Sequence, residues 1–305
     1  MGKRVPCKIF VTGGTGLLGS TLVRTAPKEF EVAASYNKNA MITERARFIQ
    51  IDITDKTRVF EVFDEIKPEV LIHTAAVANV DYCETHKEEV WRVNVIGTAN
   101  LLDACDKNGT KMIFTSTNAV FDGEHAPYSE EDEPNPINYY GKTKLEAETL
   151  VRKNGAKHTV ARLMTMYGWN NPGERQNPVT WLLSKLTKGE TIHVVDDVYN
   201  NHLFADNCAD ALWAIVKRDK VGIYHIAGGD CISTYELALK TADVFGLDKT
   251  LIKRVKSDFF KFPAPRPRNT CYVTEKMEKE LGVRPLGVKE GLLYMRQHRS
   301  QWASA

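Results

Sequence analysis

A glycine-rich segment near the start of the chain constrains the fold more than any other feature. The sequence TGGTGLLG occupies residues 12–19, after the apolar run at residues 8–12 and before an amphipathic segment at residues 17–26. Glycine lets the backbone turn sharply and approach a diphosphate, and the first turn of a helix presents free N–H groups to an anion. A flexible loop is the alternative, but the flanking strand and helix favour a dinucleotide-binding turn. The predicted cofactor contacts are Gly13, Gly16, Leu17, Leu18 and Gly19.

The first half of the chain alternates apolar runs with helical patterns. Continuous apolar strands between helices are typical of a parallel sheet that is covered on both faces. We therefore predict an α/β, doubly wound (Rossmann) domain over residues 1–164 and a smaller C-terminal substrate-binding α/β region over residues 165–305, with an interleaved boundary. The predicted strands are residues 8–12, 31–35, 47–51, 70–74, 112–116 and 158–162. Predicted helices include residues 55–67, 84–107, 179–188, 206–217, 234–245 and 288–297, and three prolines make residues 262–268 an extended loop.

The end of the second predicted strand indicates which dinucleotide is preferred. An acidic residue about 20 positions after the glycines would hold the ribose 2′-hydroxyl of NAD. The sequence SYNK at residues 35–38 contains no acid, and Ser35, Asn37 and Lys38 could bind a 2′-phosphate. NADP(H) is therefore favoured, NAD(H) stays possible, and a solvated lysine is the alternative for Lys38. Asp52, with Ile53 beside it, is the predicted contact for the adenine.

A tyrosine and a lysine four residues apart form the candidate catalytic pair. Tyr140 and Lys144 share one face of a predicted helix. A phenol is a poor acid–base group near neutral pH unless nearby positive charge stabilises its anion, which Lys144 would supply. Ser116 and Thr117 end the fifth strand, at the sheet edge where such folds bind ligands, and a hydroxyl there can donate to a developing alkoxide. The alternative for Tyr140 and Lys144 is a spacing that arises by chance, and the alternative for Ser116 and Thr117 is a turn or a helix cap.

Together these motifs make the chain resemble an extended short-chain dehydrogenase/reductase, and within that group the dTDP-4-dehydrorhamnose reductase-like family. The resemblance also covers LIHTAA at residues 71–76, NVIGT at residues 94–98, VFDG at residues 120–123 and RPRN at residues 266–269. It implies NADPH-dependent reduction of the 4-keto group of a nucleotide-linked 6-deoxysugar, and a homodimer. It also implies roles for four further residues: Asn94 as support for the lysine through water, Ala75 and Ala76 along the cofactor, and Thr117 as the catalytic hydroxyl. A polar helix residue bonded within its own helix is the alternative for Asn94.

Two departures from that family concern the sugar. Asn118-Ala119 stands where the reductases carry Asp-Tyr, and Tyr272-Val273 where they carry Leu-Asp. Asn118-Ala119 also lacks the acidic pair of related dehydratases, so dehydration is disfavoured. The predicted substrate contacts are Ser116, Asn118, Arg266 and Arg268, the two arginines being either a diphosphate clamp or solvated loop charges.

The regulatory β subunit of methionine adenosyltransferase resembles the same reductases and keeps Asn at the position of Asn118. An NADP-binding regulatory subunit is therefore an alternative function, as is another nucleotide-sugar reductase or epimerase.

Composition excludes several other classes. The 305 residues carry 41 Lys+Arg and 39 Asp+Glu, so a net charge of +2 gives no reason to expect a nucleic-acid or membrane-surface partner. We expect neither a membrane span nor a secretory signal, because no apolar run approaches the required length. The six cysteines lie far apart in the sequence, which favours reduced thiols and a cytoplasmic location over disulfides, and no metal site is expected.

Overall fold

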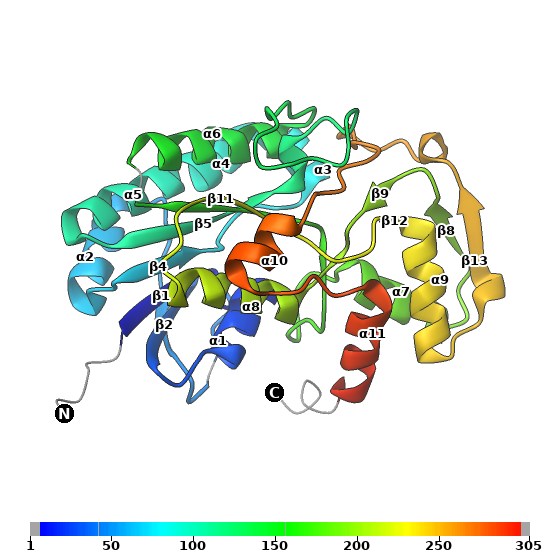
Figure 1. Ribbon diagram of the computed structural model, residues 1–305, viewed down its shortest axis with the longest axis horizontal. Helices are drawn as coiled ribbons and strands as arrows, with labels where there is room; N and C mark the ends of the chain where they lie inside the picture. Colours follow the sequence, from blue (N-terminus) through cyan, green and yellow to red (C-terminus); the bar gives the residue numbers. More distant parts are fainter. Residues whose placement is uncertain (1–6, 42, 156, 300–305) are drawn as a thin grey trace.

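A seven-stranded parallel sheet forms the centre of the molecule (Figure 1), in the order β11-β6-β5-β4-β1-β2-β3. The computed structural model describes residues 7–41, 43–155 and 157–299. The strands are β1 Cys7–Thr12, β2 Phe30–Tyr36, β3 Arg47–Gln50, β4 Val70–His73, β5 Lys111–Thr117, β6 Thr159–Leu163 and β11 Gly222–Ile226. The chain runs from β1 outward to β3 and then returns to the other side of β1, so the order reverses between β1 and β4. This confirms the predicted doubly wound α/β fold and places its switch point at the end of β1.

Helices cover both faces of the sheet because its strands alternate between two buried cores. Along β1, Ile9 and Val11 belong to one core and Phe10 to the other. Leu22 of α1 (Leu17–Thr25) and Leu212 of α8 (Ala205–Lys217) join the core of Ile9. On the opposite face lie α2 (Lys56–Ile66), α5 (Gly97–Asn108) and α6 (Tyr139–Lys153). Both faces of the sheet are therefore apolar, as the continuous apolar strands predicted.

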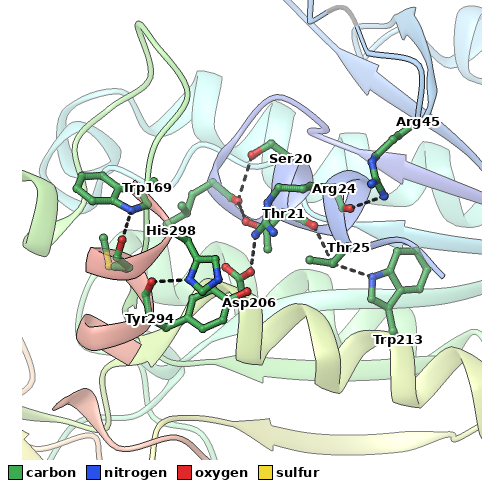
Figure 2. Close-up of polar contacts among 12 residues, drawn as sticks. Ser20, Thr21, Arg24, Thr25, Arg45, Trp169, Asp206, Trp213, Tyr294 and His298 are labelled. Atoms are coloured by element: carbon green, nitrogen blue, oxygen red, sulfur yellow. Dashed lines mark hydrogen bonds and ion pairs between the residues drawn. The ribbon is translucent and has the colours of Figure 1, made fainter. Parts of the chain in front are cut away.

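Polar contacts fix α1 against α8. The Arg24 guanidinium pairs with the Asp206 carboxylate at 2.5 Å, and Trp213 Nε1 donates to Thr25 Oγ1 at 3.3 Å (Figure 2). These contacts lie at the far end of the helix that the glycine-rich turn opens. They hold α1 in place, and the N-terminus of α1 adjoins the glycine-rich turn.

The C-terminal half forms a third core beside the carboxyl ends of the strands (Figure 1). Its main helices, α7 (Pro178–Thr187), α9 (Thr234–Phe245) and α11 (Val288–Gln297), begin and end within about one residue of the predicted bounds. Short strand pairs complete it: β8 (Ile192–Val195) with β13 (Ile252–Val255), β9 (Tyr199–Asn200) with β12 (Ile232–Ser233), and β7 (Met166–Tyr167) with β10 (Leu203–Phe204). The remaining helix of this half, α10 (Glu275–Leu281), packs on α8 and β11. β11 and α8 follow residue 164 but belong to the central sheet and its cover, so the chain crosses between the sheet and the third core more than once.

The single helix predicted over residues 84–107 is wrong in its continuity. The structure has α3 (Val80–Thr85), α4 (Lys87–Trp91), a π-helical turn (Arg92–Ile96) and α5. His86 breaks the first junction with φ −125° and ψ 49°, which lie outside the helical region. The π turn then inserts one extra residue per turn, which re-aims the side chains around Asn94.

The prediction of six free thiols is also wrong. Cys231 and Cys271 form a disulfide between residues 40 positions apart, and Cys7, Cys83, Cys105 and Cys208 are free. Spacing along the sequence carried no sign of this pair, because the bond depends on two loops of the C-terminal half meeting in space. The inference from cysteine usage to a reducing compartment therefore does not hold for this pair.

No helix among the described residues is long and apolar enough to cross a membrane. The prediction that the chain starts without a secretory signal concerns Met1 to Pro6, which lie outside the described residues.

Candidate active site

The glycine-rich turn lies at the switch point between β1 and β4. Gly13 has φ +68°, and a Cβ there would come within 2.9 Å of the Ala75 backbone nitrogen. A Cβ on Gly19 would lie 2.1 Å from the Gly13 carbonyl oxygen, so the first turn of α1 packs directly against the loop. Glycine is therefore required at both positions, and the turn presents bare backbone to the space beyond the sheet. Ala75 follows β4 at this contact, and Ala76 lines the adjoining cavity.

The residues predicted to select NADP divide into one buried and two exposed groups. Ser35 is buried beneath the turn, where its hydroxyl accepts a hydrogen bond from the Gly13 N–H at 3.3 Å and its carbonyl accepts one from the Gly14 N–H at 2.7 Å. Asn37 and Lys38 are exposed just beyond β2. Ser35 therefore shapes the turn, and Asn37 and Lys38 are the side chains placed where a 2′-phosphate could reach them.

The two residues predicted at the adenine end have structural partners. The Asp52 carboxylate accepts hydrogen bonds from the N–H and the hydroxyl of Thr54, at 2.9 and 2.8 Å. Ile53 is buried, and its side chain fills the space above Gly97 of α5. Asp52 stays exposed at the end of β3, whereas Ile53 packs α5 against the sheet.

Thr117, Tyr140 and Lys144 meet at the carboxyl end of β5. Burial raises the pKa of Tyr140 to about 12, and a hydrogen bond with the Thr117 hydroxyl acts in the opposite direction. Burial lowers the pKa of Lys144 to about 7, which the negative charge of Glu148 partly opposes. The Lys144 ammonium lies 4.0 Å from the centre of the Phe114 ring. The site therefore holds a protonated phenol next to a hydroxyl, and an amine that titrates near neutral pH.

The start of α6 is fixed from three directions, which sets the position of Tyr140. The Asn138 side chain caps the helix by accepting from the Gly141 N–H at 2.9 Å, and its amide donates to the Pro265 carbonyl at 3.2 Å. A Cβ on Gly141 would lie 2.0 Å from the Ala119 carbonyl oxygen. The helix therefore packs in direct backbone contact with the segment that follows Thr117, and glycine is needed for that approach.

Asn94 lies in the π turn and bonds outside its own helix. Its side-chain oxygen accepts from the Val77 N–H at 2.8 Å, and its amide donates to the Val77 carbonyl at 3.1 Å and to Thr143 Oγ1 at 3.2 Å. The alternative of a purely intrahelical side chain is wrong. Asn94 joins the loop after β4 to the residue preceding Lys144, so it positions the helix that carries the candidate catalytic pair.

A buried histidine connects this region with the glycine-rich turn. His73 Nδ1 lies 2.8 Å from Thr12 Oγ1, and His73 Nε2 lies 3.0 Å from Thr98 Oγ1. Because the Thr98 hydroxyl donates to the Asn94 carbonyl at 2.7 Å, we assign the His73 proton to Nε2 and the Thr12 hydroxyl as donor to Nδ1. Burial lowers the pKa of His73 to about 3, so the ring stays neutral. The imidazole therefore links β1, β4 and α5 without adding charge near Lys144.

A cavity of about 960 Å³ brings the turn together with Thr117, Tyr140 and Lys144, the candidate catalytic group. Of the predicted residues, those that line it are Gly13, Gly16, Leu17, Leu18, Gly19, Ala76, Ser116, Thr117, Asn118, Tyr140, Lys144, Arg266 and Arg268. Ser35, Asn37, Lys38, Asp52, Ile53, Ala75 and Asn94 are outside this set.

The opposite wall comes from residues that the sequence did not indicate: Asn170, residues 174–178, Val195, Val198, Asn200, Thr234, residues 257–258, Phe260 and Phe262. Their distance from the glycines in the sequence concealed their place in the site.

The predicted substrate contacts occupy distinct environments. Ser116 Oγ is buried without a hydrogen-bond partner at the cavity wall, and the Asn118 amide donates to Thr270 Oγ1 at 2.7 Å. Arg266 pairs with the Asp81 carboxylate at 2.8 Å and lies over the Phe262 ring. Arg268 is exposed on the same loop. Since a carboxylate already neutralises Arg266, Arg268 is the better placed of the two arginines to meet a diphosphate.

The fold and this site define a class: a Rossmann-fold, NAD(P)-dependent oxidoreductase of the extended short-chain dehydrogenase/reductase type. The chain belongs to the family described as the RmlD substrate binding domain, whose model matches residues 7–299. No group of three or more potential metal-ligating side chains occurs in the part of the chain that the structure describes.

Three known proteins are similar to this chain over most of its length. It is 33% identical over 300 residues to the probable low-salt glycan biosynthesis reductase Agl14 of Haloferax volcanii, covering 97% of this chain and 99% of that protein. It is 30% identical over 301 residues to methionine adenosyltransferase 2 subunit beta of Bos taurus, covering 93% and 87%. A crystal structure of dTDP-4-dehydrorhamnose reductase from Bacillus anthracis in complex with NADP has the same fold, with a TM-score of 0.85, 24% identity, and coverage of 95% and 99%.

Proposed function

We propose that this protein is an NADPH-dependent reductase of the 4-keto group of a nucleotide-linked 6-deoxysugar. One observation carries the proposal: Thr117, Tyr140 and Lys144 line the same cavity as the glycine-rich turn. Family membership and the reductase relative support reduction of a nucleotide sugar. Tyr140 keeps its proton near neutral pH, so it can donate that proton to a carbonyl oxygen, as the reduction requires.

The cavity fits a dinucleotide on structural grounds. Gly13 and Gly19 leave a cradle that a Cβ would fill, and α1 begins at its edge. The turn would hold the diphosphate, Ala76 would lie along the cofactor, and Asn37 and Lys38 would meet a 2′-phosphate. When bound, the reduced nicotinamide supplies the hydride. NADP in the Bacillus anthracis structure of the same fold agrees with this choice.

The chain's own residues divide the proton chemistry among them. Thr117 and Tyr140 direct their hydroxyls at the carbonyl oxygen, which polarises the carbonyl and stabilises the developing alkoxide. Tyr140 donates its proton to that oxygen. The Lys144 ammonium stabilises the phenolate that remains, so its positive charge is needed during turnover. Asn94 and Asn138 hold α6 and thereby fix the distance between the tyrosine and the substrate.

The decisive experiment replaces the proton donor. Tyr140→Phe should lower kcat by about 10²–10⁴-fold and leave NADPH affinity nearly unchanged, because the ring still fills the wall but no longer donates a proton. Turnover is measured as the loss of NADPH absorbance with a panel of dTDP- and UDP-linked 4-keto sugars. Tyr139→Phe is the matched control, since the Tyr139 hydroxyl donates to the Lys87 carbonyl. Near-normal turnover by Tyr140→Phe would refute the assignment.

The second candidate is an NADP-binding regulatory subunit. The 30% identity with methionine adenosyltransferase 2 subunit beta over most of the chain favours it. It predicts tight NADP binding, no NADPH oxidation with any sugar of the panel, and co-purification with a larger synthetase. The turnover assay therefore separates the two candidates directly.

The oligomeric state and location belong to the same proposal. We propose a cytoplasmic homodimer, which the resemblance to the reductases implies. Light scattering of the purified protein tests the dimer, and fractionation of the source cells tests the location.

A further inference from the structure

The thiol chemistry of this chain is concentrated in the Cys231–Cys271 disulfide. Burial raises the pKa of the free Cys7 and Cys83 thiols to about 11, which keeps both protonated and unreactive near neutral pH. Cys105 and Cys208 are fully buried. By contrast, Cys231 is exposed in the loop before β12, whereas Cys271 is buried, with only 2% of its surface exposed. External thiols therefore meet this pair before any other described cysteine.

The disulfide joins two segments that meet at the substrate side of the cavity. Thr270, directly before Cys271, accepts from the Asn118 amide at 2.7 Å and donates to Asn200 Oδ1 at 3.0 Å. The Asn118 amide also lies 3.2 Å from Asn200 Oδ1. We call Asn118, Asn200 and Thr270 the polar triad. Its first member follows Thr117, and all three line the cavity.

The other half of the disulfide reaches the same triad. Ile232 follows Cys231 and pairs with Asn200 in the short β9–β12 ladder. The disulfide therefore links the segment that ends in Thr270 to the strand that pairs with Asn200, so it ties together the surroundings of two members of the triad. A two-residue ladder is weak by itself, so the covalent bond adds a restraint on the triad to that of the surrounding hydrogen bonds.

Polar contacts also hold the loop before Cys271, among them the bond from the Asn138 amide to the Pro265 carbonyl. Asp81 accepts from the Ala264 N–H at 3.2 Å and pairs with Arg266, and Arg268 accepts a backbone bond from the Tyr199 N–H at 2.7 Å. Phe262, at the start of this loop, is 50% exposed. With the disulfide open, these contacts keep the loop near the cavity but allow it to move.

We propose that Cys231 and Cys271 form a thiol–disulfide exchange site that controls the substrate side of the cavity. The oxidised form holds the polar triad and Arg268 ready for the nucleotide part of the substrate, and the reduced form releases them. Neither cysteine belongs to the glycine-rich turn at residues 12–19, so we expect cofactor affinity not to respond. The substrate named here rests on the proposed function, but the restraint on the loop does not.

The exchange balances with a low-molecular-weight disulfide as oxidant. The Cys231 thiolate attacks one sulfur of the oxidant, and the first thiolate leaves. The Cys271 thiolate then attacks the Cys231 sulfur of the mixed disulfide, forms the protein disulfide and releases the second thiolate. The two protons of the protein thiols pass to the released thiolates, and the oxidant gains two electrons. A dithiol reverses the sequence.

The test compares the full chain in the two redox states, prepared with oxidised glutathione and with dithiothreitol. Alkylation and intact mass should count four thiols in the first state and six in the second. Trypsin should then cut after Lys261 and Arg268 faster in the reduced state, because the loop is freer. Affinity for dTDP and UDP, measured by calorimetry, should fall about tenfold on reduction, while NADPH affinity changes by less than about twofold.

Two variants complete the test. Cys231→Ser should behave as the reduced protein under both conditions, and Cys7→Ser, which removes a free thiol, should keep the full redox response. Equal cutting rates in the two states, or six thiols after oxidation, would overturn the proposal. Failure of the proposed function would show separately, as absence of NADPH oxidation in both states with the difference in cutting intact.

Discussion

A buried ion pair beneath the catalytic helix allows a sharp test of how the site is held. Arg162 of β6 and Glu148 of α6 are 1% and 0% exposed. Arg162 Nε lies 3.2 Å from each carboxylate oxygen, and Nη2 lies 3.0 Å from Oε2. His225 accepts from Arg162 Nη1 at 3.5 Å, and burial lowers the pKa of His225 to about 3, so this ring stays neutral and adds no second positive charge beside the guanidinium. Glu148 is therefore the carboxylate that neutralises the Arg162 guanidinium.

Removing one partner should be far more costly than removing both. Glu148→Leu leaves a buried guanidinium unpaired and should lower the free energy of unfolding by about 3–5 kcal/mol, and Arg162→Met should cost a similar amount. The double variant should lie within about 1–2 kcal/mol of the parent, because no unpaired charge remains. A total stability of about 5–15 kcal/mol is usual for a folded domain, so either single variant would lose a large share of it.

Urea unfolding followed by far-UV circular dichroism measures all four proteins of this cycle. Additive costs in the double variant, or single costs below about 1 kcal/mol, would refute the reasoning. Glu148 also lies one helical turn after Lys144, so the single variant that lacks this carboxylate should show a lower Lys144 pKa in its rate profile.

Three further predictions concern the cavity and a residue that supports it. Gly19→Ala should abolish NADPH binding and lower Tm, because its Cβ would lie 2.1 Å from the Gly13 carbonyl oxygen. Gly16→Ala is the control and should keep the parent Tm, because the nearest atom to its Cβ would lie 3.6 Å away. Equal melting curves for the two variants would contradict this. Because the folded pKa of Lys144 is lowered to about 7, the amine is charged below that pH and neutral above it, so kcat/KM should fall as pH rises through about 7. Lys144→Met should lose this pH dependence, and a parent rate profile that stays flat through that range would count against the role of the ammonium. Asn94→Ala should lower kcat more than it changes NADPH affinity, since its bonds hold the start of the catalytic segment; a loss confined to NADPH affinity, measured by fluorescence titration, would argue against it.

The sequence by itself determined the features that depend on neighbours along the chain. The apolar runs gave six of the seven sheet strands within a residue or two, and the glycine spacing located the turn. The spacing of four between Tyr140 and Lys144 placed both on one face of α6. Such features follow from backbone sterics, capping and the helical repeat. These effects act over a few residues, so they can be predicted without a structure.

Only the tertiary structure decided the features that depend on distant segments meeting. β11 completes the sheet although it follows residue 221, and the far wall of the cavity comes from loops more than 150 residues beyond the turn. The pairing of Arg266 with Asp81 left Arg268 as the exposed arginine, and the approach of two loops joined Cys231 to Cys271. The π turn at Asn94 belongs here as well, because the Val77 and Thr143 partners that its side chain requires lie 17 and 49 residues away. Burial, charge pairing and disulfide formation depend on which residues are neighbours in space. The local sequence pattern does not predict those neighbours when they are far apart along the chain.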